Sequence, residues 1–211
     1  SGDRAALERG TPRGDTEYAT RHFPPIQVDG IVEDGQTIRR GGIALTAHMT
    51  PGHTPGCTSW STTVREAGAV RRVLFLCSIT VAGNRLVGNR AYPRIASDFR
   101  ATFAKLEGMQ ADIVLPGHPE MVGVFEKKAR REAGEADAFV DPAALARIVA
   151  ASRAEFQGAF DRERAGVPDG AREPARRAAA RQEPGGAGRR RAGVRPERAG
   201  AEQADTVQTT E

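Results

Sequence analysis

Residues 43–60 read IALTAHMTPGHTPGCTSW and hold the clearest structural pattern in the chain. From Ile43 to His48, apolar residues alternate with small or polar ones, a period of two that predicts a strand. A Pro-Gly pair then ends the strand and turns the chain, so we expect His53 to project from a loop at the strand's exit. Such a histidine is well placed to serve as a metal ligand or a catalytic base.

The same arrangement recurs later in the chain. The apolar run Ile113-Val114-Leu115 predicts a short strand, and Pro116-Gly117-His118 follows it directly. Because turns favour Pro-Gly, an ordinary turn is the simpler interpretation of either triplet alone. The repetition makes a shared metal an equal alternative, since neutral imidazole is a common zinc ligand.

The remaining pattern predicts an α/β fold in which strands alternate with helices. Around the charged loop at Gly68, two β-rich runs at residues 60–64 and 73–77 indicate a hairpin. Three helices are expected: one from a Ser97 cap to Gly108, one around residues 127–131, and one from the Asp141-Pro142 start to Arg164. The first 35 residues look like the end of a helix followed by an irregular loop.

Composition divides the chain near residue 165. The last 46 residues, 166–211, contain 9 Arg, 10 Ala, 7 Gly and 4 Pro, but no Leu, Ile, Phe, Tyr, Trp or Met. Such a segment cannot bury enough apolar area to offset the entropy of ordering, so it predicts a disordered tail. The expected organisation is therefore a domain over residues 1–165 and a tail over 166–211.

Several classes of function are disfavoured by composition. No apolar run approaches the 18 residues of a membrane span. The net charge is only +4 over 211 residues and the Arg-rich tail has no aromatic residue, which disfavours nucleic-acid binding. Four histidines and two cysteines exclude zinc fingers. The chain begins at a serine without a recognisable leader, so we expect a processed chain or a piece of a longer one.

Several segments together resemble one family, the metallo-β-lactamases of class B subclass 3. The similarity covers roughly residues 1–165, and its specificity lies in the combination of segments. It is carried by HTPGCTSW at 53–60, FPP at 23–25, VD at 28–29, DG at 34–35, TAH at 46–48, SIT at 78–80, GN at 88–89, YP at 92–93 and PGHP at 116–119. The resemblance implies the C-terminal part of an αββα metallo-β-lactamase sandwich.

The resemblance also implies the residues of the site. His53 matches a ligand of the first zinc ion and His118 a ligand of the second, while Ser78 and Thr80 match positions that bind the substrate. The implied activity is hydrolysis of the β-lactam amide ring, which confers antibiotic resistance. In this chemistry zinc polarises the carbonyl and supplies hydroxide at neutral pH. The implied partner is a small-molecule β-lactam. His48, at the end of its strand, is expected to be structural.

One part of the family pattern is absent. The motif His-x-His-x-Asp-His, which supplies two ligands to each zinc ion, does not occur in the 211 residues. We therefore expect a domain without its N-terminal half, with apolar surface exposed where that half would pack and with weak or no catalysis. Two alternatives stay open: a catalytically incompetent remnant, and another binuclear zinc hydrolase of the same superfamily.

The two cysteines complete the implied features. Members of this subclass have a bridge at the matching positions, which implies a disulfide between Cys57 and Cys77; the alternative is a pair of buried thiols. Metal ligation by these cysteines is disfavoured, because they lack the Cys-x-x-Cys spacing. A disulfide in turn implies an oxidising compartment, so a periplasmic or secreted protein.

Overall fold

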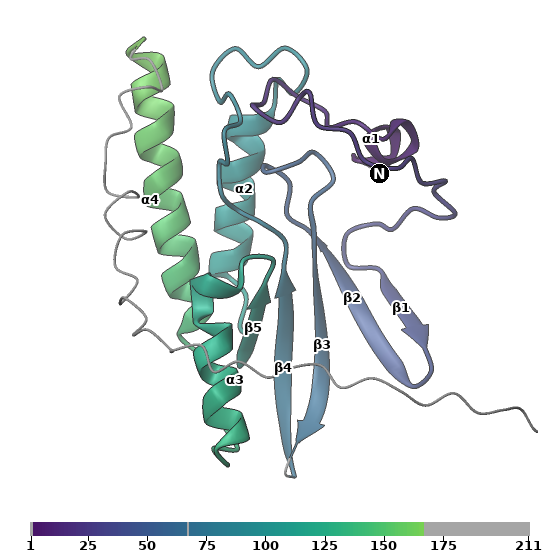
Figure 1. The fold of residues 1–211 in the computed structure, drawn as a ribbon, viewed down its shortest axis with the longest axis vertical. Coiled ribbons are helices and arrows are strands. Elements are labelled where there is room, and N and C mark those ends of the chain that lie inside the picture. The colour runs from purple at the N-terminus through teal and green to yellow at the C-terminus, as the bar shows by residue number, and fades with distance from the viewer. Residues whose placement is uncertain (1, 67, 167–211) are drawn as a thin grey trace, which may run out of the picture. The chain divides into compact units, whose positions relative to one another are not determined.

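A computed structural model describes residues 2–66 and 68–166, which fold as a mixed α/β structure (Figure 1). The predicted tail, 166–211, lies outside the described residues from 167 onward. In chain order the elements are α1 (Arg4–Arg9), β1 (Thr37–Arg40), β2 (Ile43–Met49), β3 (Thr58–Glu66), β4 (Ala69–Leu76), α2 (Ile95–Glu107), β5 (Ile113–Pro116), a 3-10 helix (Pro119–Val122), α3 (Val124–Glu132) and α4 (Ala144–Arg164).

The five strands form one sheet in the order β1-β2-β3-β4-β5. The first four are antiparallel to their neighbours, whereas β5 runs parallel to β4, with Leu76 opposite Pro116. The β2–β3 loop, the segment after β4 and the segment after β5 therefore all lie beyond the same end of the strands, which we call the loop edge of the sheet. This edge holds every predicted site residue, because His53, Ser78, Thr80 and His118 lie in these three segments.

One face of the sheet packs against the helices. Leu74 and Val114 from this face share a buried core with Phe99 and Phe103 of α2 and Phe156 of α4. The three ring centroids lie 5.2 to 5.9 Å apart, within the range of favourable aromatic contacts. α2 and α4 lie side by side in Figure 1, and their apolar faces meet over this cluster.

The opposite face of the sheet carries exposed apolar side chains. Residues paired across neighbouring strands point to the same face, and Phe75 is paired with Trp60 and Leu115 on the side away from the core. Four large apolar side chains on this side are between 40% and 61% exposed: Ile38, Ile43, Val64 and Phe75. The exposed apolar surface predicted from the sequence is therefore present.

The predicted strands and helices are present, but β1 was not predicted and two helix starts differ. The predicted hairpin is β3–β4. The predicted charged helix is α3, in which Lys128 pairs with Glu132. The predicted start of α2 at Ser97 is wrong: the helix begins at Ile95, and the Ser97 hydroxyl donates instead to the Arg94 carbonyl. The start predicted at Asp141 is also early, because a turn precedes α4.

Candidate functional site

The loop that carries His53 is fixed by contacts with α2. Gly52 adopts a φ of +141°, and a Cβ at this position would lie 2.7 Å from a ring carbon of Phe99. Only glycine satisfies both the backbone conformation and the close packing. The Thr102 hydroxyl donates to the Pro51 carbonyl at 2.6 Å, so the residues preceding His53 are bound to a buried face of the helix.

His53 is held with one ring nitrogen engaged. Its Nδ1 lies 2.9 Å from the carbonyl oxygen of Thr80, which can only accept, so Nδ1 carries the proton. In the neutral ring the lone pair is then on Nε2, the arrangement found in metal-binding histidines whose other nitrogen donates to a carbonyl. The Asn84 side-chain amide donates to the His53 carbonyl at 3.1 Å and fixes the backbone as well.

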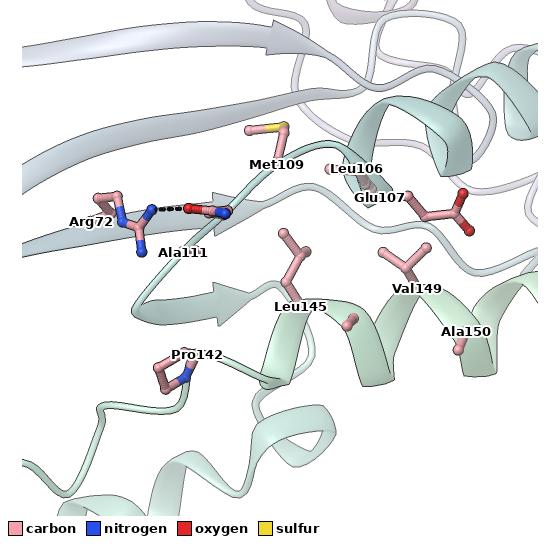
Figure 2. Close-up of a pocket in the computed structure, with 11 residues that line it drawn as sticks. Arg72, Leu106, Glu107, Met109, Ala111, Pro142, Leu145, Val149 and Ala150 are labelled. Carbon is pink, nitrogen blue, oxygen red and sulfur yellow. Dashed lines mark hydrogen bonds between the residues drawn. The ribbon is translucent and has the colours of Figure 1, made fainter.

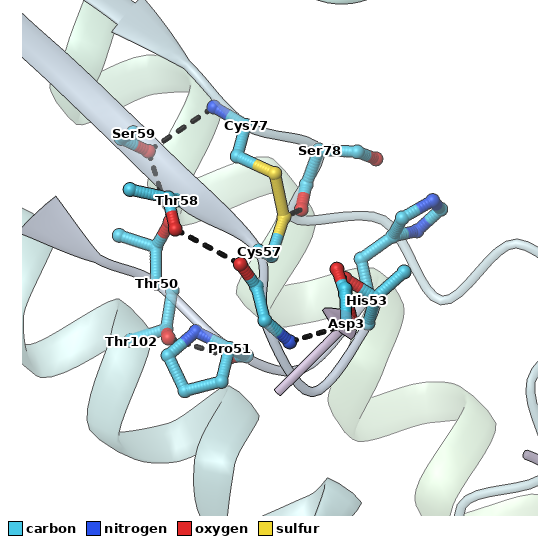
Figure 3. Close-up of a disulfide and its surroundings, with 12 residues drawn as sticks. Asp3, Thr50, Pro51, His53, Cys57, Thr58, Ser59, Cys77, Ser78 and Thr102 are labelled. Carbon is cyan, nitrogen blue, oxygen red and sulfur yellow. Dashed lines mark hydrogen bonds between the residues drawn. A yellow bond between two sulfur atoms is a disulfide. The ribbon is translucent and has the colours of Figure 1, made fainter. Parts of the chain in front are cut away.

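A disulfide joins the loop that carries His53 to the segment that follows β4. Cys57 and Cys77 are bonded, with their Cα atoms 5.9 Å apart, as the resemblance implied (Figure 3). The segment after Cys77 carries both predicted substrate-binding residues, and the hydroxyls of Ser78 and Thr80 lie 3.1 Å apart. His53, Ser78 and Thr80 are therefore brought into one hydrogen-bonded group.

His118 lies at the same edge in a more open position. Pro116, two residues before His118, is opposite Leu76, two residues before Ser78, so the parallel pairing places both side chains beyond the same sheet edge. The His118 side chain is 53% exposed, and its Nδ1 lies 3.3 Å from a carboxylate oxygen of Glu120. Its ring is therefore less restrained than that of His53.

The other two histidines take no part in this group. His48 shares a hydrogen bond of 2.7 Å with the Ser61 hydroxyl within the sheet, in agreement with the structural role expected for it. Burial lowers the pKa of His48, with a further contribution from the positive charge of Lys105 that outweighs the opposing effect of Asp34. His22 is exposed in the loop that precedes β1.

The described residues do not complete a metal site. Within residues 2–66 and 68–166, no three or more His, Cys, Asp or Glu side chains gather in a way that could hold a metal ion. His53 is arranged as a ligand would be, but zinc requires three or four ligands in total. The remaining ligands of any zinc ion at this edge would have to come from elsewhere, as the missing motif implies.

Two cavities differ in their relation to the site. One of about 300 Å³ adjoins His53, and its walls include Ala6, Leu7, Tyr18 and Phe23, so it can hold an apolar group next to the imidazole. The other, of about 510 Å³, lies between the end of α2 and the start of α4, near Arg72 and Leu145 (Figure 2). It borders the residues that precede β5, whereas His118 follows β5, so it lies away from the candidate site.

Two residues around His53 were not expected from the sequence. Asn84 lies in a loop, and Asp3 reaches the His53 loop from the start of α1. Polar residues in irregular segments carry no periodic signal, so these contacts depend on the tertiary fold.

No protein-family model matches the chain. Among solved structures, BJP-1, a subclass B3 metallo-β-lactamase of Bradyrhizobium japonicum, is 40% identical, with a TM-score of 0.74 over 79% of this chain and 63% of its own. The resemblance to the subclass B3 metallo-β-lactamases is confirmed. The mixed α/β fold, one five-stranded sheet with helices, agrees with the expected C-terminal part of an αββα sandwich.

Two further solved metallo-β-lactamases give similar values. The protein from Cronobacter sakazakii is 39% identical, with a TM-score of 0.71, over 77% of this chain and 58% of its own. FEZ-1 from Legionella gormanii is 31% identical, with a TM-score of 0.72, over 78% and 64%. The chain thus spans about three fifths of the length of these metallo-β-lactamases.

Proposed function

We propose that this chain is part of a zinc-dependent hydrolase that opens the β-lactam ring, with His53 supplying a ligand to one zinc ion and His118 to another. The observation that carries the proposal is the fixed His53 ring, whose Nδ1 is bound to the Thr80 carbonyl and whose Nε2 is left to bind a metal. Zinc, when bound, would polarise the lactam carbonyl and lower the pKa of a bound water.

The chain's own residues would bind and orient the substrate. The hydroxyls of Ser78 and Thr80 can donate to a substrate carboxylate, and their mutual contact keeps them close together. The apolar cavity beside His53 would receive a substituent of the antibiotic. The disulfide supports an oxidising location, which we propose to be the periplasm or the exterior. In the described residues, no helix has the length and apolarity to span a membrane.

The exposed sheet face supports a second part of the proposal. The apolar side chains at Ile38, Ile43, Val64 and Phe75 would be covered by the N-terminal half of the fold, which would also bring the absent zinc ligands. A catalytically incompetent remnant is the alternative function, favoured by the absence of a three-residue metal group in the described part of the chain.

Zinc stoichiometry and complementation together test the proposal. The chain alone should bind fewer than two zinc ions after dialysis, because its ligands are incomplete. Fused to the part of BJP-1 that it does not cover, it should bind two and hydrolyse a chromogenic cephalosporin. His53→Ala should abolish this activity, whereas the matched control His22→Ala should leave it unchanged.

A folded fusion that binds two zinc ions but leaves the cephalosporin intact would refute the β-lactamase assignment. A fusion that binds no zinc would instead favour the remnant.

A further inference from the structure

The carboxylate of Asp3 is bonded to the loop that presents His53. One oxygen accepts a hydrogen bond from the Thr54 hydroxyl at 2.6 Å, and the other accepts from the Gly56 backbone N–H at 2.8 Å. Thr54 directly follows His53, so the contact fixes the backbone next to the imidazole. Figure 3 shows Asp3 beside the loop that carries His53. Hydrogen bonds to an ionised carboxylate are stronger than those between neutral groups.

Asp3 makes these bonds instead of capping its own helix with its side chain. It occupies the N-cap of α1, where an aspartate side chain normally accepts from the second or third N–H of its own helix. Here the side chain makes no cap hydrogen bond, and the N–H of Ala6 instead reaches the Asp3 backbone carbonyl. The carboxylate thus serves a loop fifty residues away rather than its own helix.

The two segments also approach each other more closely than side chains allow. A Cβ on Gly2 would lie 2.3 Å from the Pro55 carbonyl oxygen, and one on Gly56 would lie 2.4 Å from the Asp3 nitrogen. Glycine at both positions lets the backbones touch, which brings the short Asp3 side chain within reach of Thr54 and Gly56. The contact is therefore built from both sides.

We propose that Asp3 is a positioning residue for His53. Asp3 holds Thr54 and Gly56 on one side of the loop, while Asn84 and Thr80 hold the His53 carbonyl and Nδ1 on the other. The imidazole is then presented with Nε2 free and its orientation fixed before any metal arrives. This inference rests on the proposed function, in which His53 is a zinc ligand, and it assigns the N-terminal segment a role in that site.

The first measurement uses the full chain without metal. Long-range ¹H–¹⁵N spectra of histidine-labelled protein, recorded near pH 8.5 so that ordinary imidazoles are neutral, report the tautomer of each ring. Wild-type His53 should be the Nδ1–H tautomer. Asp3→Ala should shift its tautomer ratio by about tenfold toward a mixture, and Asp3→Asn, which retains an acceptor oxygen, should restore most of the native ratio. The His48 signal should not move.

The matched control is Asp15→Ala. Asp15 lies in the same N-terminal region and accepts from the Arg90 N–H at 3.0 Å, and within the described residues it forms no hydrogen bond to the His53 loop, so its loss should leave the His53 signal unchanged. If Asp3→Ala fails to fold, Thr54→Val removes one of the two bonds without altering α1, and it should shift the ratio in the same direction by less.

The second measurement is the zinc affinity of the fusion to the uncovered part of BJP-1, which Asp3→Ala should lower by about 10- to 100-fold, the usual effect of losing an outer partner of a ligand. An unchanged His53 tautomer in both Asp3→Ala and Thr54→Val, or an equal shift in Asp15→Ala, would overturn the positioning role. If the fusion to the uncovered part of BJP-1 bound no zinc at His53 while the tautomer still responded, the proposed function would fail and the positioning role would stand.

Discussion

Reduction of the Cys57–Cys77 disulfide should destabilise the fold by an amount set by the loop it closes. The two cysteines are 20 positions apart and enclose the β3–β4 hairpin. The chain-entropy relation for a loop of this length gives about 3 kcal/mol at 25 °C. For a domain of this size, 1 kcal/mol corresponds to about 2–4 °C in Tm, so reduction should lower the Tm by about 6–12 °C.

The assay compares oxidised chain with chain that has been reduced in denaturant and refolded under reductant, because Cys57 is buried. Mass spectrometry should first show a gain of about two daltons on reduction, which establishes that one bridge was present. Calorimetry then gives both Tm values, and urea titration should show a lower midpoint with little change in slope. Reduced wild type is preferable to a cysteine variant, because it leaves the packing atoms in place.

The same perturbation should act locally, since the bridge joins the His53 loop to the segment that carries Ser78. Amide hydrogen exchange should accelerate in residues 50–57 and 77–80 more than in α4. Equal Tm values for the two forms would contradict this stabilisation, because they would mean that the sheet alone already restrains both ends of the hairpin. A uniform acceleration of exchange would refute the local part.

Three further predictions concern separate contacts. Gly52→Ala should destabilise the chain by about 2 kcal/mol or more in urea unfolding, because its Cβ would collide with Phe99 at a φ that disfavours side chains. Hydrogen bonds from Arg72 lower the pKa of Asp112 to about 2, so wild type should lose stability relative to Asp112→Asn as pH falls from about 4 toward 2. Phe75→Thr should reduce self-association in light scattering, because it removes apolar area from the uncovered sheet face.

Each has a control within the chain. Gly30→Ala, where a Cβ meets nothing within 4 Å, should be close to neutral, and a similar loss there would contradict the Gly52 argument. If the pairing of the Asp112 carboxylate contributes nothing, the stability of Asp112→Asn should fall with pH as steeply as that of wild type. Val70→Thr changes an exposed apolar residue on the opposite side of β4, so an equal fall in self-association there would contradict the role of the Phe75 face.

Local patterns predicted most of the fold. Strand β2 and the hairpin follow from period-two alternation and turn residues, and α2 from the spacing of Phe99, Phe103 and Leu106. Strand β1 was not predicted, because all four of its residues are exposed at the sheet edge and give no alternation. The helix starts were misplaced because the residues that resemble caps make other bonds.

Candidate site residues could be predicted where a turn follows a strand. They could not be predicted where their positions depend on long-range contacts. His53, Ser78 and Thr80 occupy strand exits, so their meeting follows once the strand order is known. Asp3 lies some fifty residues from Thr54, and no pattern within either segment indicates the other. The tautomer of His53 depends on the Thr80 carbonyl, which only the fold brings to it.

The parallel placement of β5 has a consequence for the order in which the molecule folds. Strands β1, β2, β3 and β4 are joined in sequence by short loops, so the entropic cost of closing these loops is small. This four-stranded meander can therefore form early. Strand β5 can join only after residues 77–112, including α2, have crossed over the sheet. We therefore expect His118 to reach its position after strands β1 to β4 have paired. In a nascent chain, the segments that carry His53, Ser78 and Thr80 would emerge before the segment that carries His118.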